Sequence, residues 1–155
     1  MKIRLSDEND AEKVGHVLHN CYNIDTLDEG KSAYLGELSK KHSFVIAEVD
    51  DKIVGLASFK LHGLPKHGLA ELDRIAVLED YRRQGVASKL FQGLVDELKK
   101  HYEKHGMNLR KLFLLTHEDN TRAQYFYKCL GFSNETVLKD HYYKDVSELV
   151  MSMFF

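Results

Sequence analysis

Several features that define particular protein classes are scarce or missing in this sequence. Its two cysteines, Cys21 and Cys129, are too few for a disulfide framework, and neither has the spacing of a metal ligand. The one proline, Pro65, lies in an expected loop, and the chain has no repeat or low-complexity stretch. No apolar run approaches the roughly 18 residues that a membrane span needs, and the segment Met1–Arg4 lacks a signal peptide's apolar core. We therefore expect a cytoplasmic protein with no membrane partner.

The charge balance excludes a further class of partner. Lysine and arginine number 22 against 24 aspartates and glutamates, which leaves a formal net charge of −2. Such a chain has no general attraction to nucleic acid, so we expect no nucleic-acid partner. Apolar residues at 43% and charged residues at 30% are typical of a folded protein. At this length we expect a single domain that covers residues 1–155.

The segment from Leu72 to Leu98 carries the strongest functional signal. It passes from an apolar strand through a charged turn to Gly85, at the start of an amphipathic helix. A glycine at this point lets backbone N–H groups approach a ligand, and the positive end of the helix favours an anion. Arg82 and Arg83 add positive charge just before it. The pattern predicts a phosphate site, although a plain turn into a surface helix is the alternative, and neither a P-loop nor a G-x-G-x-x-G motif is present.

Hydrophobic periodicity predicts strands and helices along the whole chain. We expect strands at 2–5, 44–49, 53–61, 69–77, 111–115, 135–139 and 149–154. We expect one helix at 10–22, a short helix with Tyr34, Leu35 and Leu38 inward, a long helix with Val86, Leu90, Leu94 and Leu98 inward, and a fourth helix capped by Asn120.

Two motifs, separated by a helix and a strand, point to one family. Residues 82–87 read RRQGVA, which resembles the R/Q-x-x-G-x-G/A motif with which GCN5-related N-acetyltransferases (the GNAT family) grip the pyrophosphate of coenzyme A. Residues 120–132 read NTRAQYFYKCLGF, which is similar to the family's N-x-x-A-x-x-x-Y-x-x-x-G-F element at every defined position. The resemblance covers nearly the whole chain. One departure is small, because Leu78-Glu79 stands where many members have a proline.

The resemblance implies both a fold and an activity. The fold is α/β (mixed α+β), with a central mixed, mostly antiparallel sheet of about seven strands flanked by about four helices. The activity is that of an acyltransferase, which moves the acetyl group of acetyl-CoA to a primary amine by direct transfer in a ternary complex, without a metal. The alternative is a catalytically silent acetyl-CoA-binding sensor or interaction module.

The family's cofactor contacts carry over by position. The backbone near Ile75 and Val77 is expected to pair with the pantetheine arm, and an amide there to stabilise the oxyanion. Asn120 is expected to bond to the same arm, although capping its helix could be its only role. The pyrophosphate is expected on the backbone amides of Arg83, Gln84, Gly85, Val86, Ala87 and Ser88, with Arg82 beside it.

Two residues are candidates for proton transfer. Tyr127 holds the position of the family's general acid, and a phenol with a pKa of about 10 stays protonated at neutral pH. Core packing is its alternative role, and Tyr125 should point off that face. Glu71 precedes Val77 by six residues, where the histone-acetyltransferase branch has its catalytic glutamate. Glu71 and Asp73 could serve as the base, or could only bind a cationic acceptor while ordered water acts.

The sequence is compatible with several acceptor amines. In the family its site is built from the first two helices, their connection and the last loop, which are residues 22–30 and 140–145 here. Acidic and aromatic side chains in both segments suit a cationic amine, but they are also ordinary loop composition. A polyamine, an amino sugar, an amino acid or a protein amine would fit, and a contact from His117 is an added expectation. Whether the protein forms a homodimer stays open as well.

Overall fold

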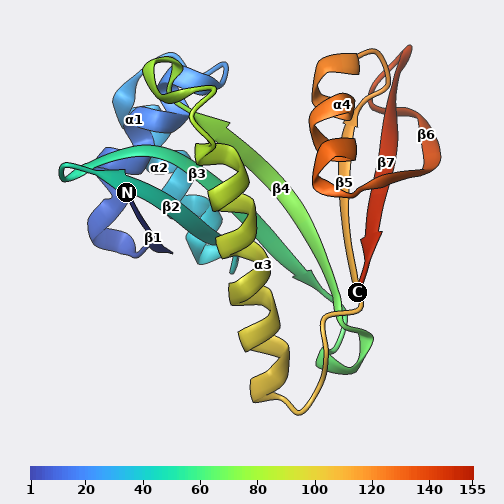
Figure 1. The fold of residues 1–155 in the computed structure, drawn as a ribbon. Coiled ribbons are helices and arrows are strands. Elements are labelled where there is room, and N and C mark those ends of the chain that lie inside the picture. Colours follow the sequence, from blue (N-terminus) through green and yellow to red (C-terminus); the bar gives the residue numbers. More distant parts are fainter.

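The computed structural model describes residues 1–155 and has four α-helices around one seven-stranded sheet (Figure 1). The strands are β1 (Lys2–Leu5), β2 (Ser43–Val49), β3 (Lys52–His62), β4 (Leu69–Val77), β5 (Lys111–His117), β6 (Ser133–Tyr143) and β7 (Val146–Phe154). The helices are α1 (Ala11–Cys21), α2 (Leu27–Ser39), α3 (Val86–Lys104) and α4 (Thr121–Leu130), with 3-10 turns η1 (Glu8–Asp10), η2 (Pro65–His67) and η3 (Glu79–Tyr81). The expected fold class is confirmed. The last two strands are longer than predicted, because their hairpin continues pairing as far as Tyr143 and Val146.

Neighbouring strands are antiparallel everywhere except at the middle of the sheet. The strand order is β1-β2-β3-β4-β5-β7-β6, and β4 and β5 are the parallel pair. They pair only from Leu69 opposite Lys111 to Glu71 opposite Phe113. Beyond this point the two strands separate, so that the sheet opens into a V (Figure 1). The rest of β4 therefore has one backbone edge without a partner strand, and such an edge can pair with an extended ligand.

Helices cover both faces of the sheet, and each face has its own apolar core. On one face α3 packs against alternate strand residues such as Val45 and Ala47. On the other face α1 and α2 pack against the intervening residues, such as Phe44 and Ile46. The predicted stripe of α3 is confirmed as buried: Val86, Leu90, Leu94 and Leu98. Because strand residues alternate between the two faces of the sheet, α3 begins on one side of the V, and α1 and α2 lie on the other side.

The inward face of α2 differs from the prediction at one position. Tyr34 is fully buried and donates a hydrogen bond to the carbonyl of Asp7 at 2.8 Å, and Leu38 packs on the same core. Leu35, however, is exposed, so its expected inward orientation is wrong. Gly30 and Tyr34, four residues apart, form the face of α2 that packs closely against α1. Leu35 points away from this face. None of the four helices combines the length and apolar character of a membrane span.

Gly15 and Gly30, where α1 and α2 meet, lie too close to the facing backbone to carry a side chain, which gives a test of the fold. A Cβ on Gly30 would lie 2.5 Å from the carbonyl oxygen of Gly15. We expect Gly30→Ala to lower the free energy of unfolding by about 1–3 kcal/mol, because the helices must separate. Gly36→Ala on the same helix is the control, since its Cβ would meet nothing within 4 Å. Denaturant unfolding that ranked Gly30→Ala equal to or above Gly36→Ala in stability would contradict this account.

Candidate active site

A cavity of about 660 Å³ lies where the end of β4, the start of α3 and α4 meet. It is lined by Ile75, Ala76, Val77, Tyr81, Arg82, Arg83, Gly85, Val86, Ala87, Ser88, Asn120, Arg122, Ala123, Phe126 and Tyr127. The structure thus brings together all but one of the predicted cofactor residues. The exception is Gln84, whose side-chain amide donates to the carbonyl of Asp80 at 2.9 Å and so supports the turn instead. Its backbone contact with a cofactor stays a prediction.

Free backbone N–H groups face this cavity at the start of α3. Gly85 is the N-cap, in a left-handed conformation with φ 76° and ψ 6°, and no side chain caps the helix. The first helical hydrogen bond runs from the amide of Lys89 to the carbonyl of Gly85. The amides of Val86, Ala87 and Ser88 therefore have no partner within the helix, and no acidic residue lies in its first turn. This arrangement is suited to an anion such as a diphosphate.

The open edge of β4 supplies backbone groups on the cavity wall. The amide of Leu78 bonds to the carbonyl of Val54 on β3, and the register pairs Ala76 with Leu56. By alternation the backbone groups of Ile75 and Val77 point the other way, into the V. Side chains that reach their carbonyls agree, since Arg82 Nε donates to Val77 O at 2.9 Å and the Tyr22 hydroxyl to Ile75 O at 3.5 Å. The amides of these two residues are therefore free to pair with an extended chain, whereas their carbonyls already accept from side chains.

Tyr127 joins the cavity to the main core. Its ring packs beside Phe132 and Phe126, with centroid distances of 5.9 and 5.4 Å. Burial raises the pKa of the Tyr127 hydroxyl above its ordinary value. Tyr125, on the same helix, is 72% exposed, as the spacing predicts. Tyr127 therefore packs against the core and also lines the cavity, while its role as general acid stays a prediction.

A second cavity, of about 810 Å³, lies beside the first and shares Asn120 with it. It is lined by Tyr22, Asn23, Ile24, Ala33, Glu71, Leu72, Asp73, Arg74, Leu115, Thr116, His117, Asn120, Tyr142, Tyr143 and Glu148. The two segments expected to surround an acceptor, the α1–α2 connection and the β6–β7 hairpin, both reach its wall. At Asn120 the side-chain oxygen accepts from the amide of Ala123 at 3.1 Å, so the predicted cap is confirmed.

The carboxylates on β4 have partners that the sequence did not reveal. Glu71 is only 9% exposed, and His62 Nε2 lies 2.7 Å from one of its oxygens. Lys60 Nζ lies 3.8 Å from the other oxygen of Glu71 and 2.7 Å from Asp73. Both partners come from β3, opposite β4 in the sheet. The strands themselves were predicted, but only the register shows which side chains of β3 and β4 meet.

A bulge in β4 explains why Arg74 also reaches this cavity. Ser58 pairs with Arg74 and Phe59 with Leu72, so Asp73 is an extra residue on β4. Asp73 and Arg74 consequently line the same cavity although they are consecutive. The Arg74 guanidinium lies 5.1 Å from the centre of the Tyr22 ring, and burial raises the pKa of the Tyr22 hydroxyl. Arg74 was not among the predicted site residues, because no local pattern signals a bulge here.

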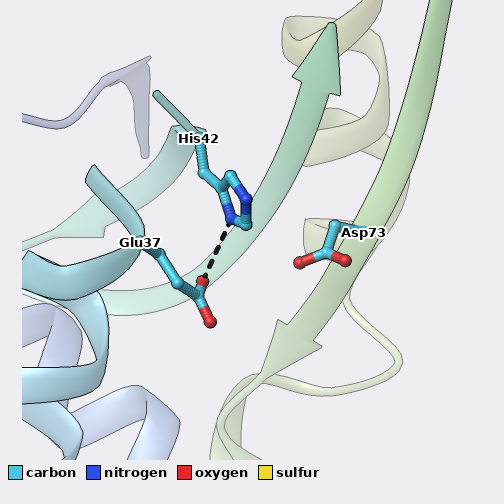
Figure 2. A group of neighbouring side chains, drawn as sticks. All are labelled: Glu37, His42 and Asp73. Atoms are coloured by element: carbon cyan, nitrogen blue, oxygen red, sulfur yellow. Dashed lines mark ion pairs between the residues drawn. The ribbon is translucent and has the colours of Figure 1, made fainter. Parts of the chain in front are cut away.

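Behind this wall, Glu37, His42 and Asp73 come together from α2, the α2–β2 connection and β4 (Figure 2). Their nitrogen and oxygen atoms lie within 4.8 Å of one another, and His42 Nδ1 is 3.8 Å from Glu37. Each carboxylate already has a cation, however: Arg74 bonds to Glu37 at 2.6 Å, and Lys60 lies 2.7 Å from Asp73. A metal ion would have to compete with both cations. The cluster instead holds Arg74 and Asp73 in place on the cavity wall.

Comparison with known proteins gives relatives that are acetyltransferases. Residues 8–132 match the family model described as the acetyltransferase (GNAT) family. The chain is 35% identical over 113 residues to an N-alpha-acetyltransferase of Sulfurisphaera tokodaii, which covers 66% of this chain and 63% of that protein. It is 38% identical over 73 residues to the ribosomal protein bS18-alanine N-acetyltransferase of Escherichia coli, which covers 47% of this chain and 45% of that protein. The alignments thus span less than two thirds of either relative.

A solved structure extends the likeness to the whole fold. The crystal structure of the ribosomal-protein-S18-alanine N-acetyltransferase from Escherichia coli superposes with a TM-score of 0.77 at 20% identity, over 99% of this chain and 92% of that one. The family match, residues 8–132, runs from η1 to the end of the second motif and includes both cavities' walls on β4, α3 and α4. This chain belongs to the GNAT family of acetyltransferases.

Proposed function

We propose that this protein is an acetyl-CoA-dependent N-acetyltransferase whose acceptor is the α-amino group of a protein or peptide. One observation carries the proposal: two cavities of different character meet at the V between β4 and β5 and share Asn120. The first has free helix amides and a phenol, and the second has carboxylates. The first fits an anionic acyl donor, and the second fits a cationic amine.

The residues of the first cavity fit acetyl-CoA as the co-substrate. Its pyrophosphate would lie on the free amides that follow Gly85, with the guanidinium groups of Arg82 and Arg83 nearby. Its pantetheine arm would pair with the open edge of β4 at Ile75 and Val77, as an added strand does. This pairing would direct the thioester toward the second cavity. The phenol of Tyr127, held protonated by burial, would then donate a proton to the departing thiolate.

The second cavity favours an amine that is a cation before reaction. Glu71 and Asp73 lie on one wall and Glu148 on the other, so that three carboxylates outnumber the one arginine, Arg74, in the lining, which favours an ammonium group. Tyr142 and Tyr143, 61% and 66% exposed, leave the cavity open toward solvent, which allows the rest of a long acceptor to extend outward. The names of both sequence relatives, which describe N-alpha and ribosomal-protein alanine acetyltransferases, support a protein α-amine over a small amine.

Glu71 was the sequence-based choice of base, and it stays a proposal here. Its carboxylate lies in the second cavity, but His62 and Lys60 already hold its two oxygens. Glu71 could therefore act as the base only in competition with these partners, or through ordered water. Attraction of the acceptor ammonium is the role that its surroundings favour more.

Acceptor specificity tests the proposal directly. Thiol release from acetyl-CoA would be measured with peptides that begin with alanine, serine or methionine, with the same peptides blocked at the amino terminus but carrying an internal lysine, and with spermidine and kanamycin. We expect release with the free peptides, with mass spectra showing one added acetyl group at the first residue. Turnover of spermidine or kanamycin, but of no peptide, would support the acetyltransferase activity and contradict the proposed α-amine acceptor. Acetyl-CoA binding without turnover of any acceptor would favour the silent sensor.

A further inference from the structure

His117 and Glu148 form a pair on the wall of the second cavity, and the proposed reaction has so far assigned no role to His117. His117 is the last residue of β5, and Glu148 lies directly opposite it on β7 in the strand register. His117 Nδ1 is 2.5 Å from Glu148 Oε1. Both residues line the cavity, next to the shared Asn120. They are thus placed where the acceptor amine of the proposed reaction would lie.

The two partners have very different surroundings. The Glu148 side chain is 3% exposed, whereas the His117 side chain is 48% exposed. Glu148 Oε1 is buried and has no hydrogen-bond partner in the structure, and the His117 imidazole is the cationic group within ion-pair distance of it. A buried carboxylate without a partner is costly, so we expect the imidazole to direct its Nδ1–H toward Glu148. The lone pair of the other nitrogen, Nε2, then remains for a proton on the exposed side.

The position of His117 along the V matches the expected site of transfer better than that of Glu71. Glu71 belongs to the last pair of β4 and β5 residues that still lie in register, opposite Phe113. Ile75 and His117 each lie four residues beyond this pair, although the bulge at Asp73 takes up one residue on β4. Ile75 and His117 therefore lie at a similar distance from the last paired residues, Ile75 on β4 and His117 on β5. Glu71 lies at the vertex, and its carboxylate is occupied by Lys60 and His62.

We propose that His117 is the general base that deprotonates the acceptor ammonium, and that Glu148 is a positioning residue that orients the imidazole. The inference rests on the proposed acetyltransferase function. The arrangement follows a general pattern in which a buried carboxylate fixes one ring nitrogen of a histidine and leaves the other to accept a proton. The other titratable groups around the cavity are Tyr22 after α1, Glu71, Asp73 and Arg74 from β4, and Tyr142 and Tyr143 from β6.

The protons of this reaction balance. The ammonium gives one proton to Nε2 of His117, and the freed amine attacks the thioester carbonyl carbon. The carbon–sulfur bond breaks, and the sulfur takes the proton of the Tyr127 hydroxyl. A second proton leaves the new amide nitrogen and restores the Tyr127 hydroxyl. One proton per turnover stays on His117, and its exposed edge lets it pass to solvent.

The test measures five variants, of which three come first, with the best acceptor of the peptide panel. We expect His117→Gln to lower kcat/KM at neutral pH by about 100-fold, with acetyl-CoA affinity and Tm unchanged. The acid limb of the wild-type pH profile should disappear in this variant. Glu148→Gln should alter the pH profile and kcat more than KM. The matched control is His16→Gln, an exposed histidine on α1, which should behave as the wild type.

Two further results separate catalysis from structure. Added imidazole should restore part of the activity of His117→Gly, whereas no such rescue is expected of a purely structural loss. The inference is overturned if His117→Gln keeps the wild-type rate and pH profile, or if Glu71→Gln is the variant that loses the acid limb. If the proposed function is wrong, the wild type itself will transfer no acetyl group. This result differs from the two above and removes the basis of the inference about His117.

Discussion

Replacing Tyr127 by phenylalanine is expected to lower kcat by about 100-fold while leaving the affinity for acetyl-CoA within about twofold. The loss lies at the low end of general acid catalysis, because a thiol with a pKa of about 8.5 is a moderate leaving group even without a proton donor. Phenylalanine keeps the ring contacts with Phe126 and Phe132 and removes only the hydroxyl. Stopped-flow or steady-state thiol release and calorimetric titration of acetyl-CoA would measure the two quantities.

Tyr125 supplies the control for this substitution. It lies on α4 two residues away and is 72% exposed, so Tyr125→Phe removes a hydroxyl from the same helix without touching the cavity. Its kcat should equal that of the wild type. If Tyr127→Phe instead lowered Tm or acetyl-CoA affinity and left kcat intact, the residue would be a packing element only.

The pH dependence offers a second view of Tyr127. Burial raises the pKa of its hydroxyl above the ordinary value of about 10. Because an acid must be protonated to donate, its contribution is present at neutral pH and is lost only as pH rises through the raised pKa. The alkaline limb of the wild-type kcat profile should therefore lie above pH 10 and be absent in Tyr127→Phe. An alkaline limb shared by both enzymes would belong to another group.

Local patterns were enough to predict most of the fold. Apolar residues at alternating or helical spacing locate the strands and helices, because each element must bury one face. The turn at Gly85 and the helix cap at Asn120 could also be predicted, because a turn and a helix cap depend on neighbouring residues. Leu35 shows the limit of this reasoning. Its inward orientation was consistent with helical spacing, but the Gly15–Gly30 contact decides which face of α2 meets α1.

What the sequence could not show depends on contacts between distant residues. The V exists because β4 and β5 stop pairing after Glu71, and no residue near it signals that point. The bulge at Asp73 likewise follows from the register with β3 and turns Arg74 toward the second cavity. Strand register is specified by the whole sheet rather than by a local motif. For the same reason, the pairing of His117 with Glu148 was not predicted, although His117 itself was singled out.

The phosphate site is tested most strongly at Gly85, where a glutamate should weaken acetyl-CoA binding by at least about 100-fold. A carboxylate about 4 Å from a phosphate costs about 4 kcal/mol at an effective dielectric constant of 20. A side chain at Gly85 would meet nothing within 4 Å, so the loss is expected to be electrostatic more than steric. At about 100 times Kd the wild type gains about 2.7 kcal/mol of stability from the ligand, and a 100-fold weaker variant gains only about 0.4 kcal/mol.

Backbone strain must be separated from this charge effect, because Gly85 has φ +76° and any other residue is strained there. Gly106 supplies the matched control: it has φ +67°, is equally open, and follows the far end of α3. Gly106→Glu should therefore lower Tm to a similar extent, yet retain the full rise in Tm on addition of acetyl-CoA. Gly85→Gln should bind better than Gly85→Glu, because it adds a similar volume without the charge. If Gly85→Glu kept the wild-type rise in Tm, the diphosphate would have to lie away from the start of α3, and the cofactor assignments around it would fail together.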